Sequence, residues 1–340
     1  MEFGIFFPPE SPDGLEAHAR LAEAEGFDLV GLGDSQSIWR DVYASLATVA
    51  RATDDVRIGP AVTNPVTRHP AVTANSICTI DELARGRTIL GMGSGDSSVQ
   101  TIGERPARLA ELEEHVSIHR ALTRGQPTEY DGETLSLEWV ADGDRTPTIP
   151  VFLGAEGPKT LELAGRVADG VFIGTGLFPD LIEESVERVL AGAEAAGRDP
   201  DEIEMWVLAK ANVDETTDVA IDEIKMALAA SANHAFRFTL EGKRVPEEYR
   251  EPIRRLQSEY VPHEHEELGQ TRNRELVEEL GLTEYLSDRF AVAGTPADCR
   301  EKLAEIDSVP EIDGVLLTAY TDDRERFIST FGREILPNVA

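Results

Sequence analysis

The segment GPAVTNPVTRHP, residues 59–70, joins a predicted strand to a predicted helix and is the most informative part of this chain. An apolar run over residues 56–62 has the composition of a buried strand, and Pro70 suits the first turn of a helix. Between them, a proline-fenced loop carries Thr63 and Asn64. Ligands bind beyond the carboxyl ends of strands in parallel α/β proteins. The segment therefore predicts a ligand-binding loop, and an ordinary strand-to-helix connection is the alternative.

A strand followed by a helix recurs along the chain. Apolar runs without the alternation of half-buried strands occur at residues 3–7, 29–32, 56–62, 88–92, 150–153, 170–173, 203–209 and 314–319. Helical patterns lie between or after them at 14–25, 42–52, 73–83, 109–123, 158–168, 180–196, 214–230, 296–306 and 323–335. Eight such units predict an α/β fold, a (β/α)8 TIM barrel, with the run at 314–319 as its closing strand.

Two segments interrupt this spacing. Residues 126–148 contain YDGE at 130–133, which predicts a short hairpin before the fifth strand. Residues 231–289 predict a charged, largely helical insertion between the seventh and eighth strands. The apolar fraction of 41% suffices for a packed core, and no low-complexity linker divides the chain. We therefore expect residues 1–340 to form a single barrel domain.

The formal net charge is −32, and acidic residues are spread over nearly every predicted helix. Lysine occurs only at Lys159, Lys210, Lys225, Lys243 and Lys302. Such a composition is typical of halophilic proteins, because the Debye length falls to about 3 Å in molar salt and self-repulsion is screened. The alternative, an acidic face for a basic partner, requires a localised patch that the even distribution does not provide. Nucleic-acid binding is excluded, since nothing would neutralise phosphates.

The chain also carries features that concern its compartment. Cys78 and Cys299 are far apart and lie in no metal-ligand spacing. The first residues lack the basic segment and cleavage site of a secretory signal, and no apolar run approaches the roughly 18 residues of a membrane span. We expect a reduced, cytoplasmic protein without membrane attachment.

Three glycine-bearing loops follow the fourth, fifth and sixth predicted strands. GMGSGD at 91–96 is not the dinucleotide fingerprint, because its third glycine comes one position early. It allows close approach of a ligand, with Asp96 as a charge, and a plain tight turn is the alternative. In GAEGPK at 154–159, the free amides of a helix start and Lys159 would hold a phosphate. GTG at 174–176 is also permissive, so the three loops would line one rim.

Asp34 ends the second predicted strand and is either a helix cap or a ligand contact. His115 and His119 have the spacing of a two-histidine metal site, but they lie mid-helix on the outside of the predicted barrel without the intervening glutamate of metalloproteases. A surface pair is the favoured interpretation, and no metal is expected. HEH at 263–265 is interpreted as a solvated run.

Taken together, these residues resemble the luciferase-like superfamily of flavin and deazaflavin oxidoreductases, and within it most closely the coenzyme F420-dependent 5,10-methylenetetrahydromethanopterin reductases. The resemblance extends over almost the whole chain. The matching blocks are residues 3–5, 25–28, 41–43, 59–70, 91–96, 153–158, 163–170 and 191–200. It implies a barrel without a separate nucleotide domain that forms a homodimer or homotetramer.

The resemblance also implies where F420 binds. The deazaflavin would lie at the carboxyl mouth of the barrel, where relatives have a non-prolyl cis peptide at the position of Ala61-Val62. By position, Asp34, Thr63 and Asn64 would meet the ring, and Thr63 and Asn64 would orient it for catalysis. Gly93, Gly95 and Asp96 would lie near the ring and the substrate, with Asp96 as the polar substrate contact. The ribityl-phosphate side would meet Gly154, Ala155, Glu156, Gly157, Gly174 and Thr175.

Two departures concern the substrate side. Relatives usually carry a glutamate where this chain has Phe6, and a histidine where it has Ser35. Glu10 and Asp96 are the remaining nearby carboxylates. These differences leave open whether the substrate is a methanopterin-type pterin, a folate-type pterin or another electrophile.

The preferred hypothesis is an oxidoreductase that transfers a hydride between F420 and a small electrophile, with a methylene-tetrahydropterin as the preferred substrate class. One alternative is an FMN-dependent luciferase-like monooxygenase, whose oxygen chemistry a deazaflavin does not support. Another is a non-catalytic flavin-binding protein, suggested by Phe6 and Ser35.

Overall fold

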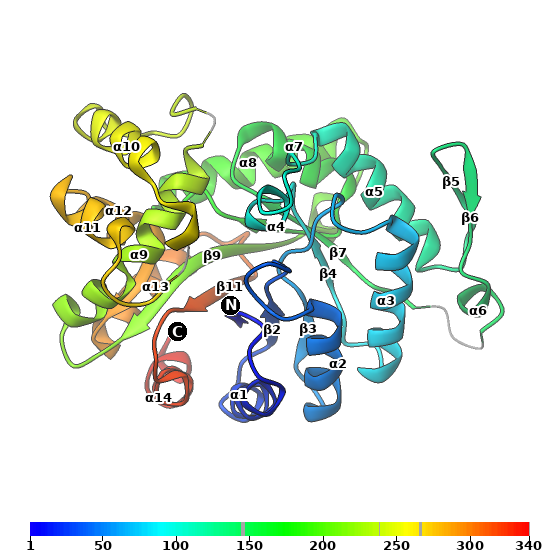
Figure 1. The fold of residues 1–340 in the computed structure, drawn as a ribbon, viewed down its shortest axis with the longest axis horizontal. Coiled ribbons are helices and arrows are strands. Elements are labelled where there is room, and N and C mark those ends of the chain that lie inside the picture. Colours follow the sequence, from blue (N-terminus) through cyan, green and yellow to red (C-terminus); the bar gives the residue numbers. More distant parts are fainter. Residues whose placement is uncertain (144–146, 238, 265–266, 340) are drawn as a thin grey trace.

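The computed structural model describes residues 1–143, 147–237, 239–264 and 267–339. Strands lie at its centre and helices surround them (Figure 1). The barrel strands are β1 (Glu2–Phe7), β2 (Leu29–Leu32), β3 (Arg57–Pro60), β4 (Leu90–Met92), β7 (Val151–Ala155), β8 (Gly170–Ile173), β9 (Glu204–Val213) and β11 (Gly314–Ala319). Their order is β3-β2-β1-β11-β9-β8-β7-β4, and each neighbouring pair is parallel.

The barrel closes between β3 and β4. Ile58 pairs with Thr88 and Thr63 pairs with Met92 through isolated parallel bridges. These bridges join the two ends of the strand order, so the described strands form a closed parallel ring with helices outside. The predicted (β/α)8 barrel is therefore confirmed. β3 ends at Pro60, two residues before the apolar run does, because the end of that run belongs to the loop.

Large apolar side chains fill the interior of the ring. The cluster consists of Phe6, Leu29, Ile89, Phe152, Phe172, Trp206 and Leu316. Glycine is required where they crowd: a Cβ on Gly4 would lie 2.8 Å from Leu316 Cδ1 and 2.9 Å from the Trp206 ring. The opposite faces of the same strands pack against helices. Burial on both faces explains why the strands read as continuous apolar runs.

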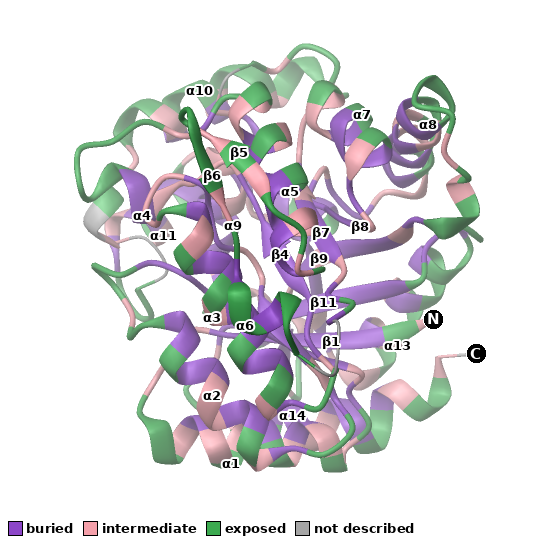
Figure 2. Cartoon of the chain, turned by 90° about the vertical axis from the view of Figure 1, so that its right-hand side faces the viewer, coloured by how far each residue is buried: buried purple, intermediate pink, exposed green. Residues whose placement is uncertain are grey.

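Helices cover the outside of the ring. They are α1 (Pro12–Ala24), α2 (Val42–Ala52), α3 (Pro70–Leu83), α5 (Leu109–Leu122), α7 (Pro158–Val167), α8 (Pro179–Ala195), α9 (Thr217–Ala235), α13 (Pro296–Asp307) and α14 (Arg324–Thr330). Capping fixes their starts, since Ser11, Asp41 and Thr295 each accept a backbone N–H from the first turn. Figure 2 shows buried faces toward the strands and exposed faces outward.

The predicted hairpin within 126–148 is present and projects from one side of the barrel (Figure 1). β5 (Thr128–Tyr130) pairs antiparallel with β6 (Glu133–Leu135), and α6 (Glu138–Ala141) follows. Asp131 and Gly132 both have positive φ, 50° and 80°, as a two-residue hairpin turn requires. The short elements α4 (Ser97–Gln100), η1 (Pro200–Glu202) and η4 (Leu336–Asn338) carry no periodic pattern and were missed, whereas η3 (Phe331–Ile335) continues α14 to the end of the helix predicted at 323–335.

The region predicted as an insertion is built from helices on the side opposite the hairpin (Figure 1). α9 continues to Ala235, five residues past its predicted end, and α10 (Glu247–Glu259), η2 (Pro262–Glu264), α11 (Arg272–Glu279) and α12 (Thr283–Phe290) follow. They share a second buried cluster that includes Phe236, Leu256 and Leu286. The missed strand β10 (Ala291–Gly294) pairs with the end of β9. The HEH motif at 263–265 falls partly outside the described residues.

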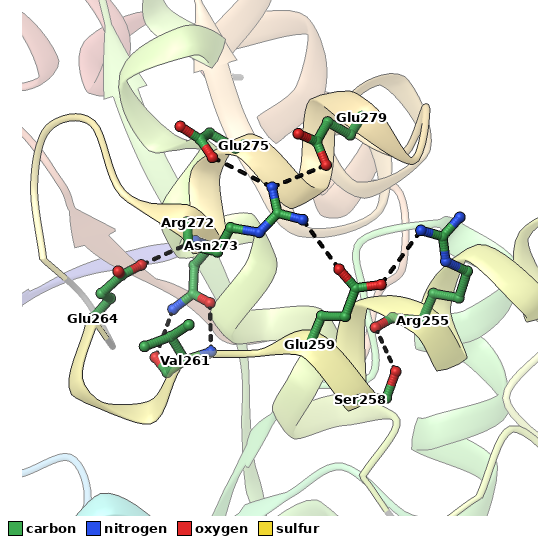
Figure 3. A network of polar contacts seen from close by, with 9 residues as sticks. All are labelled: Arg255, Ser258, Glu259, Val261, Glu264, Arg272, Asn273, Glu275 and Glu279. Carbon is green, nitrogen blue, oxygen red and sulfur yellow. Dashed lines mark hydrogen bonds and ion pairs between the residues drawn. The ribbon is translucent and has the colours of Figure 1, made fainter.

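A polar network ties α10 to α11 (Figure 3). The Arg272 guanidinium contacts Glu275, Glu279 and Glu259 at 3.3, 2.9 and 3.0 Å. The buried Asn273 amide donates to the Val261 carbonyl and accepts from the Val261 N–H at 2.9 and 2.8 Å. This network holds α10 and the segment after it against α11.

Both cysteines serve packing rather than chemistry. Cys78 and Cys299 are free and buried, and burial raises the pKa of each thiol to about 12. None of the helices in the described ranges combines the length and apolarity needed to cross a membrane.

Candidate active site

A cavity of about 350 Å³ opens at the carboxyl ends of the strands. Its walls come from the loops after β2, β3, β4, β7 and β8, from the strands β1, β9 and β11, and from the last turns of α9. This is the position at which barrels of this type bind ligands. The cavity falls within the size range of small-molecule sites.

Most of the predicted site residues come together here. The lining includes Asp34, Ala61, Val62, Thr63, Asn64, Gly93, Gly95, Asp96, Gly154, Ala155, Glu156, Gly157 and Gly174. Thr175 does not line this cavity but a smaller neighbouring pocket, where its hydroxyl is 2.9 Å from Ser185 Oγ. Lys159 is exposed and also lies outside the lining. Glu10 is bonded instead to His18 and Arg324.

The loop after β3 has the backbone geometry that the resemblance implied. The peptide bond between Ala61 and Val62 is cis. The Val62 side chain packs against two glycines, Gly91 of β4 and Gly93 just after it. A Cβ on Gly93 would lie 2.8 Å from Val62 Cγ2, and a Cβ on Gly91 would lie 3.2 Å from Val62 Cγ1. The glycines after β4 are therefore needed for loop packing as well as for access to the cavity.

Asp34 holds this loop against β2. Its Oδ2 accepts hydrogen bonds from Thr63 Oγ1 at 2.6 Å and Arg68 Nη1 at 2.5 Å, and the carboxylate is buried. Arg68 also binds Asp41, which is the N-cap of α2. Burial lowers the pKa of Arg68, but the bond to Asp34 outweighs it and raises that pKa. Asp34 therefore anchors the loop after β3 at the cavity wall. It does not cap a helix, since the N-cap of α2 is Asp41, so the interpretation of Asp34 as a helix cap is wrong.

Asn64 fixes the same loop from the other side. Its Oδ1 accepts the N–H groups of Val66 and Thr67 at 2.9 and 3.0 Å, and its Nδ2 donates to Ser98 Oγ at 3.1 Å. The side chain is buried. With its oxygen and one amide hydrogen used in this way, Asn64 shapes the loop that carries Thr63.

Basic side chains that the sequence interpretation missed lie at the mouth of the cavity. Arg237, after α9, binds Asp96 Oδ1 through Nη1 at 2.5 Å. His234 Nδ1 lies 2.6 Å from Glu156 Oε1. Lys210 of β9 and Lys243 also line the cavity. Lysine is so scarce in this chain that both were a usable signal: Lys210 directly follows the predicted strand at 203–209, whereas the placement of Lys243 depends on how the insertion folds.

The charge of the cavity differs from that of the chain. Its lining has the carboxylates Asp34, Asp96 and Glu156, the cations Lys210, Arg237 and Lys243, and His234. The lining is therefore neutral, or singly positive when His234 is protonated, in a chain with a net charge of −32. The local field at this mouth favours an anionic ligand far more than the surrounding surface does.

Of the two departures, Phe6 gives the cavity an apolar wall, whereas Ser35 lies outside the cavity lining. The Phe6 and Trp39 rings meet edge to face with centroids 6.2 Å apart, and both line the cavity. Gly33 leaves the room for them, since a Cβ there would be 2.4 Å from the Trp39 ring. Ser35 is buried and hydrogen-bonded to Ser97 Oγ at 2.9 Å. Neither residue presents a titratable group to the cavity.

His115 and His119 are buried, so the surface-pair interpretation is wrong. Their ring centroids are 6.0 Å apart, and Tyr130 of the hairpin covers His115 edge-on at 5.5 Å. The error arose because α5 turns this face toward α3 and the hairpin rather than toward solvent. Burial lowers the pKa of His115 to about 4 and of His119 to about 3. The described residues contain no cluster of three or more His, Cys, Asp or Glu side chains that could hold a metal.

A parallel (β/α)8 barrel with a ligand-sized cavity at the carboxyl ends of its strands defines a broad class of proteins. Sequence comparison identifies the family within that class. A family model described as luciferase-like monooxygenase matches residues 1–309, and the chain belongs to this luciferase-like family. It is 31% identical to the 5,10-methylenetetrahydromethanopterin reductase of Methanolobus tindarius over 343 residues, covering 99% of this chain and 100% of the relative. It is also 31% identical to that reductase of Archaeoglobus fulgidus over 345 residues, with both chains fully covered.

Structural comparison gives a consistent result. The coenzyme F420-dependent tetrahydromethanopterin reductase of Methanopyrus kandleri superposes with a TM-score of 0.77 at 25% identity, covering 100% of this chain and 99% of that chain. The family resemblance inferred from the sequence is therefore confirmed.

The anchor role of Asp34 can be tested by amide replacement. In Asp34→Asn, Arg68 loses its buried counter-charge and keeps only the exposed Asp41, and we expect the free energy of unfolding to fall by about 3 kcal/mol. Asp41→Asn is the matched control, because it faces the same guanidinium but is exposed, and asparagine also caps helices. Urea unfolding in molar salt measures both. Equal effects of the two substitutions would contradict the assignment.

The buried histidines predict acid sensitivity. Their pKa values lie below the unfolded value of 6.5, so the unfolded chain binds more protons, and stability is lost as the pH falls from about 6.5 toward 4. Each contributes up to about 1.4 kcal/mol per pH unit. We expect His119→Leu to flatten the dependence of unfolding free energy on pH across this window. Parallel curves for the variant and the parent would show that His119 is not responsible.

Proposed function

We propose that this chain is an F420-dependent oxidoreductase that transfers a hydride between the deazaflavin and a small electrophile, a methylene-tetrahydropterin of methanopterin or folate type. The observation that carries the proposal is the composition of the cavity. Glycine backbone and aromatic rings line its inner part, and cations gather at its mouth in a protein of net charge −32. A planar ring with a phosphate-bearing tail matches that arrangement.

The residues present fit such a cofactor. The Ala61-Val62 backbone, Gly93 and Gly95 offer a surface without bulky side chains, and Asp34 with Thr63 and Asn64 holds that surface in place. The glycines at 154, 157 and 174 and the cation Lys243 would take the tail. When bound, the cofactor would supply a carbon that gives or accepts a hydride.

The chain's own part would be placement. Its walls would hold the electrophile against the ring with Asp96 as a polar contact, and the apolar Phe6–Trp39 wall would exclude water from one side. The similarity to the Methanolobus and Archaeoglobus reductases supports a methylene-tetrahydropterin as the electrophile. We further propose a single-domain chain that forms a homodimer or homotetramer in the cytoplasm.

An FMN-dependent monooxygenase is the second candidate, and the description of the matching family favours it. The cofactor separates the two, because a peroxyflavin requires nitrogen at the ring position where F420 has carbon. FMN retained on purification and oxygen consumption with a substrate would support this candidate. Cofactor binding without turnover would instead indicate a non-catalytic flavin-binding protein.

Anaerobic titration tests the proposed cofactor. We expect the chain to bind F420 and to oxidise its reduced form when methylene-tetrahydromethanopterin or methylene-tetrahydrofolate is supplied. Lys243→Ala should weaken F420 binding about tenfold or more, because it removes a cation at the mouth of the cavity. Lys159→Ala is the control, since Lys159 is exposed and outside the lining, and its affinity should equal that of the parent. Absence of binding by the parent chain would refute the function.

We also propose that the protein is halophilic. Its dispersed carboxylates repel one another, and this repulsion grows on dialysis from molar salt to about 0.01 M, where the Debye length rises to about 30 Å. We expect helical circular dichroism to be lost on dialysis and restored when potassium chloride is added back. A spectrum unchanged at low ionic strength would refute the proposal.

A further inference from the structure

The proposed function, on which this inference rests, requires a proton as well as a hydride at the electrophile. A methylene bridge between two nitrogens opens when one carbon–nitrogen bond breaks and the electron pair stays on the nitrogen. That nitrogen needs a proton, and a positioned acid in the cavity accelerates such a step. The structure therefore has to offer a titratable group that is oriented and can be reprotonated from water.

Several cavity residues do not meet this requirement. Phe6 and the buried Ser35 carry no acid. Asp34 accepts from Thr63 and Arg68, and Asp96 is bonded to the Arg237 guanidinium. Both carboxylates are therefore already bonded to a guanidinium group, and neither is available as an oriented proton donor.

His234 has the geometry that the others lack. Its Nδ1 lies 2.6 Å from Glu156 Oε1, so the carboxylate orients the ring and stabilises its protonated form. The second ring nitrogen, Nε2, is not bonded to Glu156 and lies 3.9 Å from Asp96 Oδ2. The side chain is 35% exposed, which gives water access to it.

The charges around His234 come from several elements. Glu156 follows β7, Asp96 follows β4, and Arg237 lies three residues further along the same segment as His234. Burial lowers the pKa of His234, but the carboxylates of Glu156 and Asp96 outweigh burial and Arg237 and raise it above its usual value. His234 is therefore held in its protonated form to higher pH than an isolated histidine.

We propose that His234 is the proton donor of this site and that Glu156 is its positioning residue. The Nε2 proton would pass to the nitrogen that leaves the methylene carbon as their bond breaks. Reduced F420, when bound, would supply the hydride that adds to that carbon, together with a proton lost to solvent, so that electrons and protons balance. Water then reprotonates the imidazole.

A second histidine of the chain supplies a matched control. His18 Nδ1 also lies 2.6 Å from a carboxylate, Glu10 Oε1, but neither residue lines the cavity. If the pairing alone mattered, the two histidines would behave alike. Under the proposal, only His234 affects the reaction.

The experiment compares the parent enzyme with His234→Gln, Glu156→Gln and His18→Gln in molar salt, using reduced F420 and methylene-tetrahydromethanopterin. We expect His234→Gln to lower kcat about 100-fold or more and to abolish the limb of the pH–rate profile that belongs to His234, with the affinity for F420 unchanged within about threefold. Glu156→Gln should move that limb to lower pH, and His18→Gln should match the parent enzyme.

A readout independent of turnover follows the same groups. In the cofactor-free protein labelled with ¹⁵N-histidine, the NMR titration of His234 should have a higher midpoint than in Glu156→Gln. The proposal is overturned if the two titrations coincide, if His234→Gln keeps kcat and its pH profile, or if its defect is entirely weaker F420 binding. A parent enzyme that binds no F420 refutes the proposed function itself, whereas normal turnover by His234→Gln refutes only the role of His234.

Discussion

The bond network around the Asp34 carboxylate is the constraint on which the site depends. The loop after β3 lines the cavity with its backbone, so its polar groups need hydrogen-bond partners from the neighbouring loops. Asp34 does this from β2 through Thr63 and Arg68, and Asn64 does it toward the loop after β4 through Ser98. These bonds join the loops that follow three neighbouring strands, β2, β3 and β4, at the cavity wall.

The mouth of the cavity is assembled differently, from charges that belong to distant parts of the chain. Asp96 and Glu156 come from two strand-end loops, and Arg237 and His234 come from the end of α9. Each carboxylate is matched by a base across the opening. This pairing cancels the acidity of the protein at the mouth of the cavity, where the proposed anionic cofactor would enter, in a chain with a net charge of −32.

The fold was largely predictable, because strands buried on both faces leave continuous apolar runs that the intervening helices separate. Two short elements were missed because they contain too few residues for a periodic pattern: α4 has one helical turn, and β10 is a strand of four residues that pairs with the end of β9. The floor of the site was predictable for a related reason. Its residues follow the strands directly, so their positions in the sequence place them at the same rim.

Local sequence therefore determined the barrel, its glycine-bearing loops and the residues at each strand end, since these features depend on neighbours a few positions away. Only the tertiary structure decided that His115 and His119 are buried, that Lys159 and Thr175 lie outside the main cavity, and that His234, Arg237 and Lys243 lie at its mouth. These outcomes depend on how helices and the insertion pack across the barrel. Such packing is a long-range balance of burial and charge that leaves no periodic signal in the sequence.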